Sequence, residues 1–320
     1  MHTRRRTIGA LLLLMLAVIP VWAPLTRPGL PQWRPGALPV LNLYAMARGE
    51  RFDIALLPAR ILHLLGVDGV TAVKAGIILA MLLLALAIFF WARALWDEKA
   101  GVLAAMLAVY APVFLSSIYQ TGAIAGLWLM AGVAMVGWGV FRRGIGGIVL
   151  AIAGAALALV NLPAALRPVA GFDAGPALYQ LIEPAWFWDT TSINLQTPVA
   201  WSLGLPLLAL LIIALWLSFT APSHASAQSP LRILALVGLL LLLAALFTPA
   251  QASLALILAA IPLLAVAAAG LLALTPVLQT PALWAALLLL PVLAAGPALS
   301  PDLRPIPSPN TPRPSSAISR

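Results

Sequence analysis

Acidic and basic side chains gather in one stretch of the chain that lacks a long apolar run, about residues 27–74. Within it Glu50 and Asp53 lie three residues apart, a spacing that would place both carboxylates on one face of a helix. Two carboxylates that converge, including acids from separate loops such as Asp173, Glu183 or Asp189, can act as base and acid, or hold a divalent cation against a phosphate. Glu50 and Asp53 are therefore the candidate catalytic residues. The alternative is that they solvate the loop and pair with nearby arginines, since no recognised metal-ligand spacing is present.

Other polar side chains of this stretch are suited to binding a substrate. Arg48 and Arg51 flank Glu50 and, together with Arg60, can hold an anionic head group such as a lipid phosphate or diphosphate. Asn42 and Tyr44 precede them and offer further polar contacts. The alternative is that the basic side chains only anchor the chain at the membrane interface.

A second polar stretch, about residues 167–201, carries an aromatic cluster. Trp186 and Trp188 precede Asp189 there, and Tyr179 lies a few residues earlier. Such a cluster can form a platform for a sugar or an isoprenoid, with Asp189 as a polar contact. Tryptophan is also enriched at the interface between membrane and water, which is the alternative interpretation.

The amino-acid composition indicates the class of fold that positions these residues. The chain has 320 residues, of which 63% are hydrophobic and 8% are charged. A soluble domain carries about 25% charged residues, so this chain cannot cover a surface that faces water. The prediction is an all-α, polytopic integral membrane protein. The net charge of +9 is explained by basic residues at helix ends rather than by nucleic-acid binding.

The absence of cysteine excludes disulfides, thiolate metal sites and a cysteine nucleophile. The three histidines show no ligand spacing, which argues against a histidine metal site. The sequence does not identify a cofactor, and a divalent cation held by carboxylates stays open.

The apolar segments predict about nine transmembrane helices within residues 1–299, followed by a disordered tail rich in proline and serine over residues 300–320. Eight spans remain an alternative, because the connection over residues 275–281 carries no charge. The predicted spans are Thr7–Leu25, Ala75–Trp96, Val102–Tyr119, Ala123–Phe141, Gly144–Leu166, Ser202–Phe219, Ile233–Phe247, Ser253–Leu274 and Ala282–Leu299.

Basic residues set the predicted orientation. Arg4–Arg6 precede the first span, which we interpret as an uncleaved helix with its N-terminus in the cytoplasm, and Arg142 and Arg143 end the fourth. The two polar stretches are then external loops, with an amphipathic segment at Ile54–Leu65 along the interface. No predicted span has a charged residue near its middle, which argues against an ion-coupled transporter. Prolines such as Pro112 still allow discontinuous helices, so a transporter that is not coupled to ions, a facilitator, stays open.

Three stretches resemble the bacterial polytopic membrane proteins with a glycosyltransferase C fold, namely the dolichol-phosphate-mannose-type mannosyltransferases and the YfhO-like proteins. The first is "LPQWRPGALPVLNLY" together with "LLGVDGVTAVKAG"; the second is "GVLAAMLAVYAPVFLSSIYQTGAIAG"; the third is "YQLIEPAWFWDTTSINLQTPVAWSLG". The resemblance covers roughly residues 30–220. It implies a protein of the bacterial inner membrane that transfers a sugar from an isoprenoid-phosphate donor outside the membrane, with an acid of the first external loop in the active site.

The chain departs from the family pattern in three places. The segment "APLTRPG" after the first helix contains no acid. Thr121 and Gly126 stand where the family commonly has an arginine and a glutamate, and a short tail stands where the family has a soluble domain. These departures predict a degenerate or non-catalytic relative, in which Glu50 or Asp53 can substitute for the lost acid.

The sequence therefore supports three functional hypotheses. The first is a glycosyltransferase-C-like protein of cell-envelope glycan or lipid metabolism, active or decayed. The second is a non-enzymatic membrane scaffold or subunit that binds a protein partner. The third is a transporter of lipid or a small solute.

Overall fold

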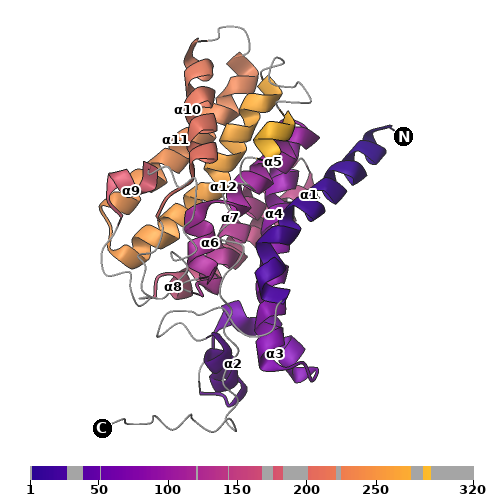
Figure 1. Ribbon diagram of the computed structural model, residues 1–320, viewed down its shortest axis with the longest axis vertical. Helices are drawn as coiled ribbons and strands as arrows, with labels where there is room; N and C mark the ends of the chain where they lie inside the picture. The colour runs from indigo at the N-terminus through magenta and orange to yellow at the C-terminus, as the bar shows by residue number, and fades with distance from the viewer. Residues whose placement is uncertain are drawn as a thin grey trace, which may run out of the picture.

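The computed structural model describes residues 2–26, 39–50, 52–119, 122–142, 144–167, 176–182, 201–220, 225–274 and 284–289. These residues form helices and, within the described ranges, no strand (Figure 1). The longer helices are α1 (His2–Thr26), α4 (Gly69–Leu95), α5 (Glu98–Val109), α7 (Ile124–Phe141), α8 (Ile145–Ala165), α10 (Leu205–Thr220), α11 (Ala225–Leu246) and α12 (Ala250–Leu274). The shorter ones are α2 (Pro39–Ala47), η1 (Ile54–Leu56), α3 (Leu57–Leu64), α6 (Pro112–Tyr119) and α9 (Leu178–Ile182).

The all-helical prediction is confirmed, and several helices have the length and composition to cross a membrane. Five helices pass this test, namely α4, α7, α8, α11 and α12, and the bent pair α5–α6 makes a sixth candidate. The apolar parts of α1 and α10, Arg6–Trp22 and Pro206–Trp216, are shorter. The count of nine spans stays a prediction, and most of the ninth segment lies outside the described residues.

The centre of the bundle is built from α4, α5, α7 and α12, which pack on one another, while α8 and α11 cover α7 and α12 (Figure 1). Every residue of α5 from Ala100 to Val109 is buried. By contrast, α8 is mostly exposed and its outward side chains are apolar, for example Ile148 and Ile152. Exposure of a large apolar face to water is unfavourable, so this face of α8 is suited to contact with lipid.

Glycines let α7 and α8 approach closely. A Cβ atom at Gly139 would lie 2.5 Å from the amide nitrogen of Ala151, and one at Gly154 would lie 2.7 Å from the amide of Val136. Small residues that allow backbone-to-backbone contact are the common means of helix association in membranes, where apolar burial supplies little driving force.

The predicted span Val102–Tyr119 is bent by 50° between α5 and α6, directly before Pro112. A proline cannot donate a backbone hydrogen bond and disfavours a helical residue before it. The next amide, that of Val113, donates instead to the carbonyl of Ser202 at 2.9 Å. Pro112 therefore interrupts this span, as the sequence allowed.

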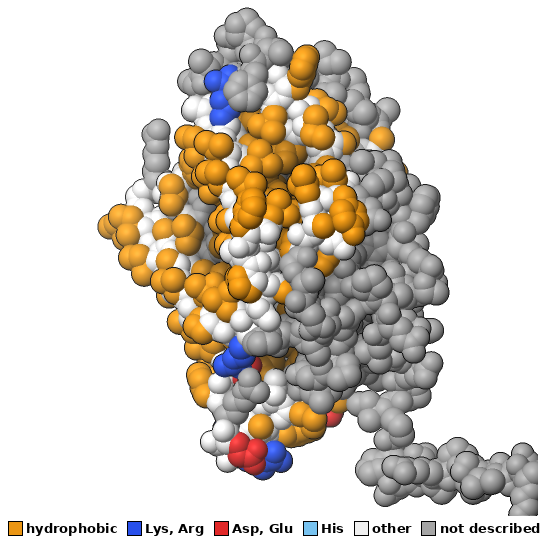
Figure 2. All heavy atoms as spheres, turned by 90° about the vertical axis from the view of Figure 1, so that its left-hand side faces the viewer, with side chains coloured by type: hydrophobic (Ala, Val, Ile, Leu, Met, Phe, Trp, Pro, Cys, Tyr) orange, Lys and Arg blue, Asp and Glu red, His pale blue; other side chains and the backbone are white. Residues whose placement is uncertain are grey.

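Charged side chains lie at the two ends of the bundle. Figure 2 shows them above and below a band of apolar side chains on one face of the molecule. One end holds residues such as Arg93 and Glu98, at the junction of α4 and α5, and the other holds the acids and arginines around α2 and α3. This distribution is that of a helical membrane protein.

Candidate functional site

The candidate site lies in a small unit that we call the α2–α3 lobe, comprising the described residues from Pro39 to Asp68. It stands at one end of the bundle, beside the start of α4 (Figure 1). Pro58 lies in the first turn of α3, where its missing N–H costs nothing. The predicted interfacial segment Ile54–Leu65 corresponds to η1 and α3 together.

The α2–α3 lobe is packed on the bundle through specific contacts. The indole N–H of Trp128 in α7 donates to the carbonyl of Ala55 at 3.0 Å. The ring of Tyr44 lies so close to Gly69 that a Cβ atom there would be 2.6 Å from the tyrosine hydroxyl. The Tyr44 ring also meets the ring of His63 edge-on, with 5.5 Å between centroids. These contacts fix the lobe over α4 and α7.

Asp53 joins the α2–α3 lobe to the end of α8. Its backbone is extended, and its carboxylate accepts a hydrogen bond from the amide of Ala55 at 3.2 Å, which caps η1. The same carboxylate lies 3.6 Å from the guanidinium of Arg167, and the two side chains are 12% and 43% exposed. Arg167 begins the second predicted loop, so this ion pair connects the two predicted loops.

The side chain of Glu50 is exposed and pairs with a residue two positions earlier in the chain. Both of its carboxylate oxygens accept hydrogen bonds from Arg48, at 2.5 and 3.0 Å. The hydrogen bond from Arg48 holds the pKa of Glu50 below its ordinary value. Such an exposed pair contributes little to stability.

The expectation that Glu50 and Asp53 share a helical face is wrong. The helix α2 ends at Ala47, and Gly49 with a φ of 78° turns the chain out of it. Only a glycine adopts that backbone region without strain. Asp53 then lies in extended chain outside any helix, so the two carboxylates belong to separate contacts.

The predicted substrate-binding residues have different surroundings. Arg48 forms an ion pair with Glu50, and the guanidinium of Arg60 donates a hydrogen bond to the carbonyl of Met46 at the end of α2. Asn42 is half-buried and has an interaction partner, and Tyr44 packs within the lobe. Their binding roles, like that of the undescribed Arg51, stay predictions.

Most of the aromatic cluster predicted from the second polar stretch lies outside the described residues, and only Tyr179 of that prediction is described, as an exposed side chain of α9. The residues outside are Trp186, Trp188 and Asp189, and also the acids Asp173 and Glu183. The described residues nearest to it form α9, whose Leu181 carbonyl accepts a hydrogen bond from the amide of Leu203 at 3.2 Å. Convergence of the acids of the two stretches stays a prediction.

Asp68 has a role that its place in the sequence did not indicate. Its carboxylate accepts hydrogen bonds from the amides of Val70 and Thr71, at 3.3 and 2.9 Å, and so caps α4. These bonds to Thr71 lower the pKa of Asp68. The cap starts α4 at Gly69, six residues before the predicted start of that span at Ala75.

Among the described residues, no group of three or more histidine, aspartate or glutamate side chains is placed to hold a metal ion. The described acids instead cap helices or pair with arginines. The divalent cation considered from the sequence therefore stays a prediction that depends on acids outside the described ranges.

Comparisons of the chain with protein-family models, with curated proteins and with solved structures find no match. The likeness to proteins of the glycosyltransferase C fold therefore rests on the three sequence stretches alone.

Proposed function

We propose that this protein is a glycosyltransferase-C-like membrane protein of cell-envelope glycan or lipid metabolism that has lost its catalytic acid and acts as a non-enzymatic scaffold or partner subunit. In this proposal it lies in the bacterial inner membrane with about nine spans, its N-terminus in the cytoplasm and the α2–α3 lobe outside. The observation that carries the proposal is that Glu50 and Asp53, the two candidate catalytic residues, are both engaged in structural contacts.

A general base needs a free lone pair and a pKa near the working pH. Asp53 already accepts the Ala55 amide and faces the Arg167 guanidinium. Glu50 accepts two hydrogen bonds from Arg48, which lower its pKa and make it a weaker base. Asp53 is therefore better suited to holding the chain in place than to removing a proton, and Glu50 is a weak base paired with Arg48.

The surface of the α2–α3 lobe also supports a binding role. Ile61, Leu64 and Leu65 at the end of α3 are exposed by half or more, as is Phe52 before η1. Exposed apolar side chains on a short amphipathic helix at a helix-bundle end are typical of a segment that lies in the membrane interface. From there the lobe can contact a lipid-linked glycan or a partner membrane protein.

The proposal is tested by assaying the purified protein in proteoliposomes with an isoprenoid-phosphate sugar donor. We expect no sugar transfer that depends on Glu50 or Asp53, and we expect the Glu50→Gln/Asp53→Asn variant to co-purify with the same membrane proteins as the wild type. These substitutions keep an acceptor oxygen at each position, so the cap of η1 is retained. Transfer by the wild type that the double variant abolishes would overturn the proposal.

A second candidate function, an active glycosyltransferase, is favoured by one observation. The ion pair between Asp53 and Arg167 places an acid of low exposure where the second predicted loop begins. In this candidate the acid serves as base or metal ligand, Arg48 and Arg51 bind the donor phosphate, and the second loop holds the acceptor. The same assay decides between the candidates, because only the enzyme loses transfer in the double variant.

A further inference from the structure

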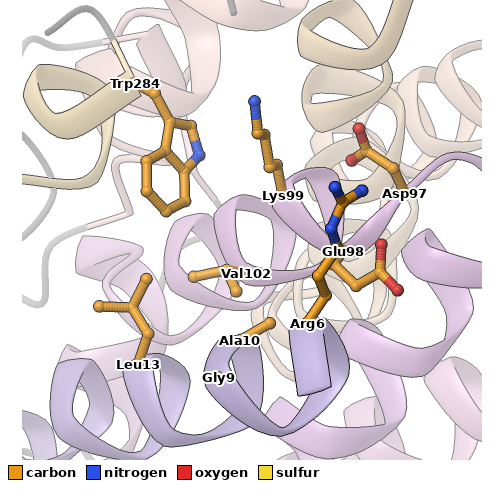
Figure 3. A pocket seen from close by; sticks show the side chains of 9 residues that line it. All are labelled: Arg6, Gly9, Ala10, Leu13, Asp97, Glu98, Lys99, Val102 and Trp284. Carbon is orange, nitrogen blue, oxygen red and sulfur yellow. The ribbon is translucent and has the colours of Figure 1, made fainter. Parts of the chain in front are cut away.

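An open cavity of about 580 Å³ lies near the beginnings of α1 and α5, at the end of the bundle opposite the α2–α3 lobe (Figure 1), and Figure 3 shows it from close by. It is bounded by the first turns of α1, the start of α5 and the short helical segment over residues 284–289. Its volume falls within the range of about 300–1,000 Å³ that is common for small-ligand pockets. It is separate from the candidate site and does not rest on the proposed function.

One wall of the cavity is charged. Arg6 of α1 and Lys99 of α5 line it together with Asp97 and Glu98 (Figure 3). The two acids are already engaged: Asp97 accepts the amide of Ala100 at 2.8 Å, and Glu98 lies 3.3 Å from the guanidinium of Arg93.

The two cations of that wall are not neutralised within the described part of the chain. Neither Arg6 nor Lys99 forms an ion pair with a described residue, whereas Glu98 is balanced by Arg93. Asp97 keeps its negative charge, so with Arg93 this wall holds three cations against two carboxylates, a net charge of about +1 that suits an anion.

The aromatic ring of Trp284 also lines the cavity. Figure 3 shows its indole nitrogen on the edge of the ring that is turned toward Lys99. This nitrogen has almost no exposed surface, so it does not itself reach a ligand in the cavity. Trp284 therefore adds aromatic surface to the wall beside the cations.

The opposite wall is apolar and leads to the lipid-facing surface. Gly9, Ala10 and Leu13 of α1 and Val102 of α5 line it. A Cβ atom at Gly9 would meet no other atom within 4 Å, so the groove is open there. Further along α1, Leu12 and Leu16 are 61% and 66% exposed and continue an apolar path away from the charged wall.

From this arrangement we infer that the cavity binds one anionic phospholipid. Arg6 and Lys99 hold the phosphate, and an acyl chain follows α1. A charged head group beside an apolar groove distinguishes a phospholipid from a soluble phosphate ester, which would use only the charged wall. Cationic side chains at this level of a membrane protein attract anionic lipid with about 1 kcal/mol each.

The test is native mass spectrometry of the full chain in detergent with phosphatidylglycerol or phosphatidylcholine added. We expect tighter binding of phosphatidylglycerol, and a loss of about fivefold for each of Arg6→Gln and Lys99→Gln. Trp284→Phe keeps an aromatic ring in the wall and removes a nitrogen that is not exposed to the cavity, so it should leave the binding of the head group unchanged. The matched control is Arg142→Gln, which removes an exposed cation outside the cavity and should leave the binding unchanged.

Two results would overturn the inference. One is equal binding of the two lipids, or a preference for phosphatidylglycerol that survives the Arg6→Gln/Lys99→Gln double substitution. The other is that soluble glycerol phosphate occupies the cavity as tightly as phosphatidylglycerol, which would assign the site to a soluble phosphate ester. Thermal unfolding of each variant, unchanged from the wild type, shows that a lost preference does not come from a misfolded chain.

Discussion

The hydroxyl of Tyr110 donates a 2.6 Å hydrogen bond to the backbone carbonyl of Ala17 in α1. Tyr119, at the end of α6, donates in the same way to the carbonyl of Val21. α1 contains prolines at positions 20 and 24, and each removes a backbone donor from the turn before it. The tyrosines donate to the carbonyls of Ala17 and Val21, each next to a carbonyl that loses its amide donor to a proline, and these bonds fasten α1 to the bent pair α5–α6.

Removing these hydroxyl groups should loosen α1. We expect Tyr110→Phe and Tyr119→Phe each to lower stability by about 1 kcal/mol, because each leaves a carbonyl with one bond fewer while the ring still packs. Thermal unfolding in detergent measures the loss, and limited proteolysis near residue 26 reports release of α1. Tyr179→Phe is the control, since Tyr179 is 65% exposed. An equal effect of all three substitutions would contradict the anchoring role.

The glycines between α7 and α8 give a second prediction. Alanine at Gly139 or Gly154 would place its Cβ atom 2.5 to 2.7 Å from backbone atoms of the facing helix. We expect each substitution to lower stability by about 1 to 3 kcal/mol through overpacking. Unfolding of the two variants by heat or denaturant measures the change.

Gly146→Ala is the matched control for these substitutions. Gly146 lies in α8 as well, but the nearest atom to an added Cβ is 3.8 Å away, in the side chain of Arg142. Alanine favours a helix over glycine by about 1 kcal/mol, so this variant should be as stable as the wild type or more so. A loss of stability at Gly146 equal to that at Gly139 would show that helix contact is not the cause.

The sequence predicts the helices well and the site poorly, for physical reasons. A long apolar run without charge, such as the one in α4, has to form a helix in lipid because every backbone group needs an internal partner. The end of α7 at Phe141, before Arg142, is also readable from charge. Such local signals do not require knowledge of what lies next to the helix.

The contacts of the α2–α3 lobe depend instead on residues far apart in the chain. Nothing in the sequence near Asp53 indicates that Arg167 is its partner, or that Trp128 binds the carbonyl of Ala55. The helical spacing of Glu50 and Asp53 was misleading because Gly49 ends that helix. A glycine just past the last apolar residue is a known stop signal and would have corrected this expectation.

The cap formed by Asp68 should make stability depend on pH. Its pKa is lowered in the folded chain by hydrogen bonds from Thr71 and Val70. Its contribution is therefore full above the unfolded-state pKa of about 4, and is lost as the pH falls from there through the lowered folded-state pKa. Asp68→Ala should lower stability at neutral pH by about 1 kcal/mol.

Asp68→Asn separates the charge of this cap from its acceptor oxygen. The wild type should be more stable than Asp68→Asn at neutral pH, and the difference should shrink as the pH is lowered below about 4. Thermal unfolding of both proteins across this range provides the measurement. A difference that stays constant down to pH values below the folded-state pKa would mean that the carboxylate charge does not stabilise the start of α4.

A double-mutant cycle on Asp53 and Arg167 tests whether the Asp53 carboxylate has a structural role. We expect Asp53→Asn and Arg167→Gln each to lower the unfolding temperature. The free energy of unfolding lost by the double variant should be smaller than the sum of the two single losses. The difference, which is the coupling energy of the pair, should be about 0.5 to 1 kcal/mol. Strictly additive losses, or no loss with Asp53→Asn, would contradict the claim that this carboxylate holds the α2–α3 lobe to α8.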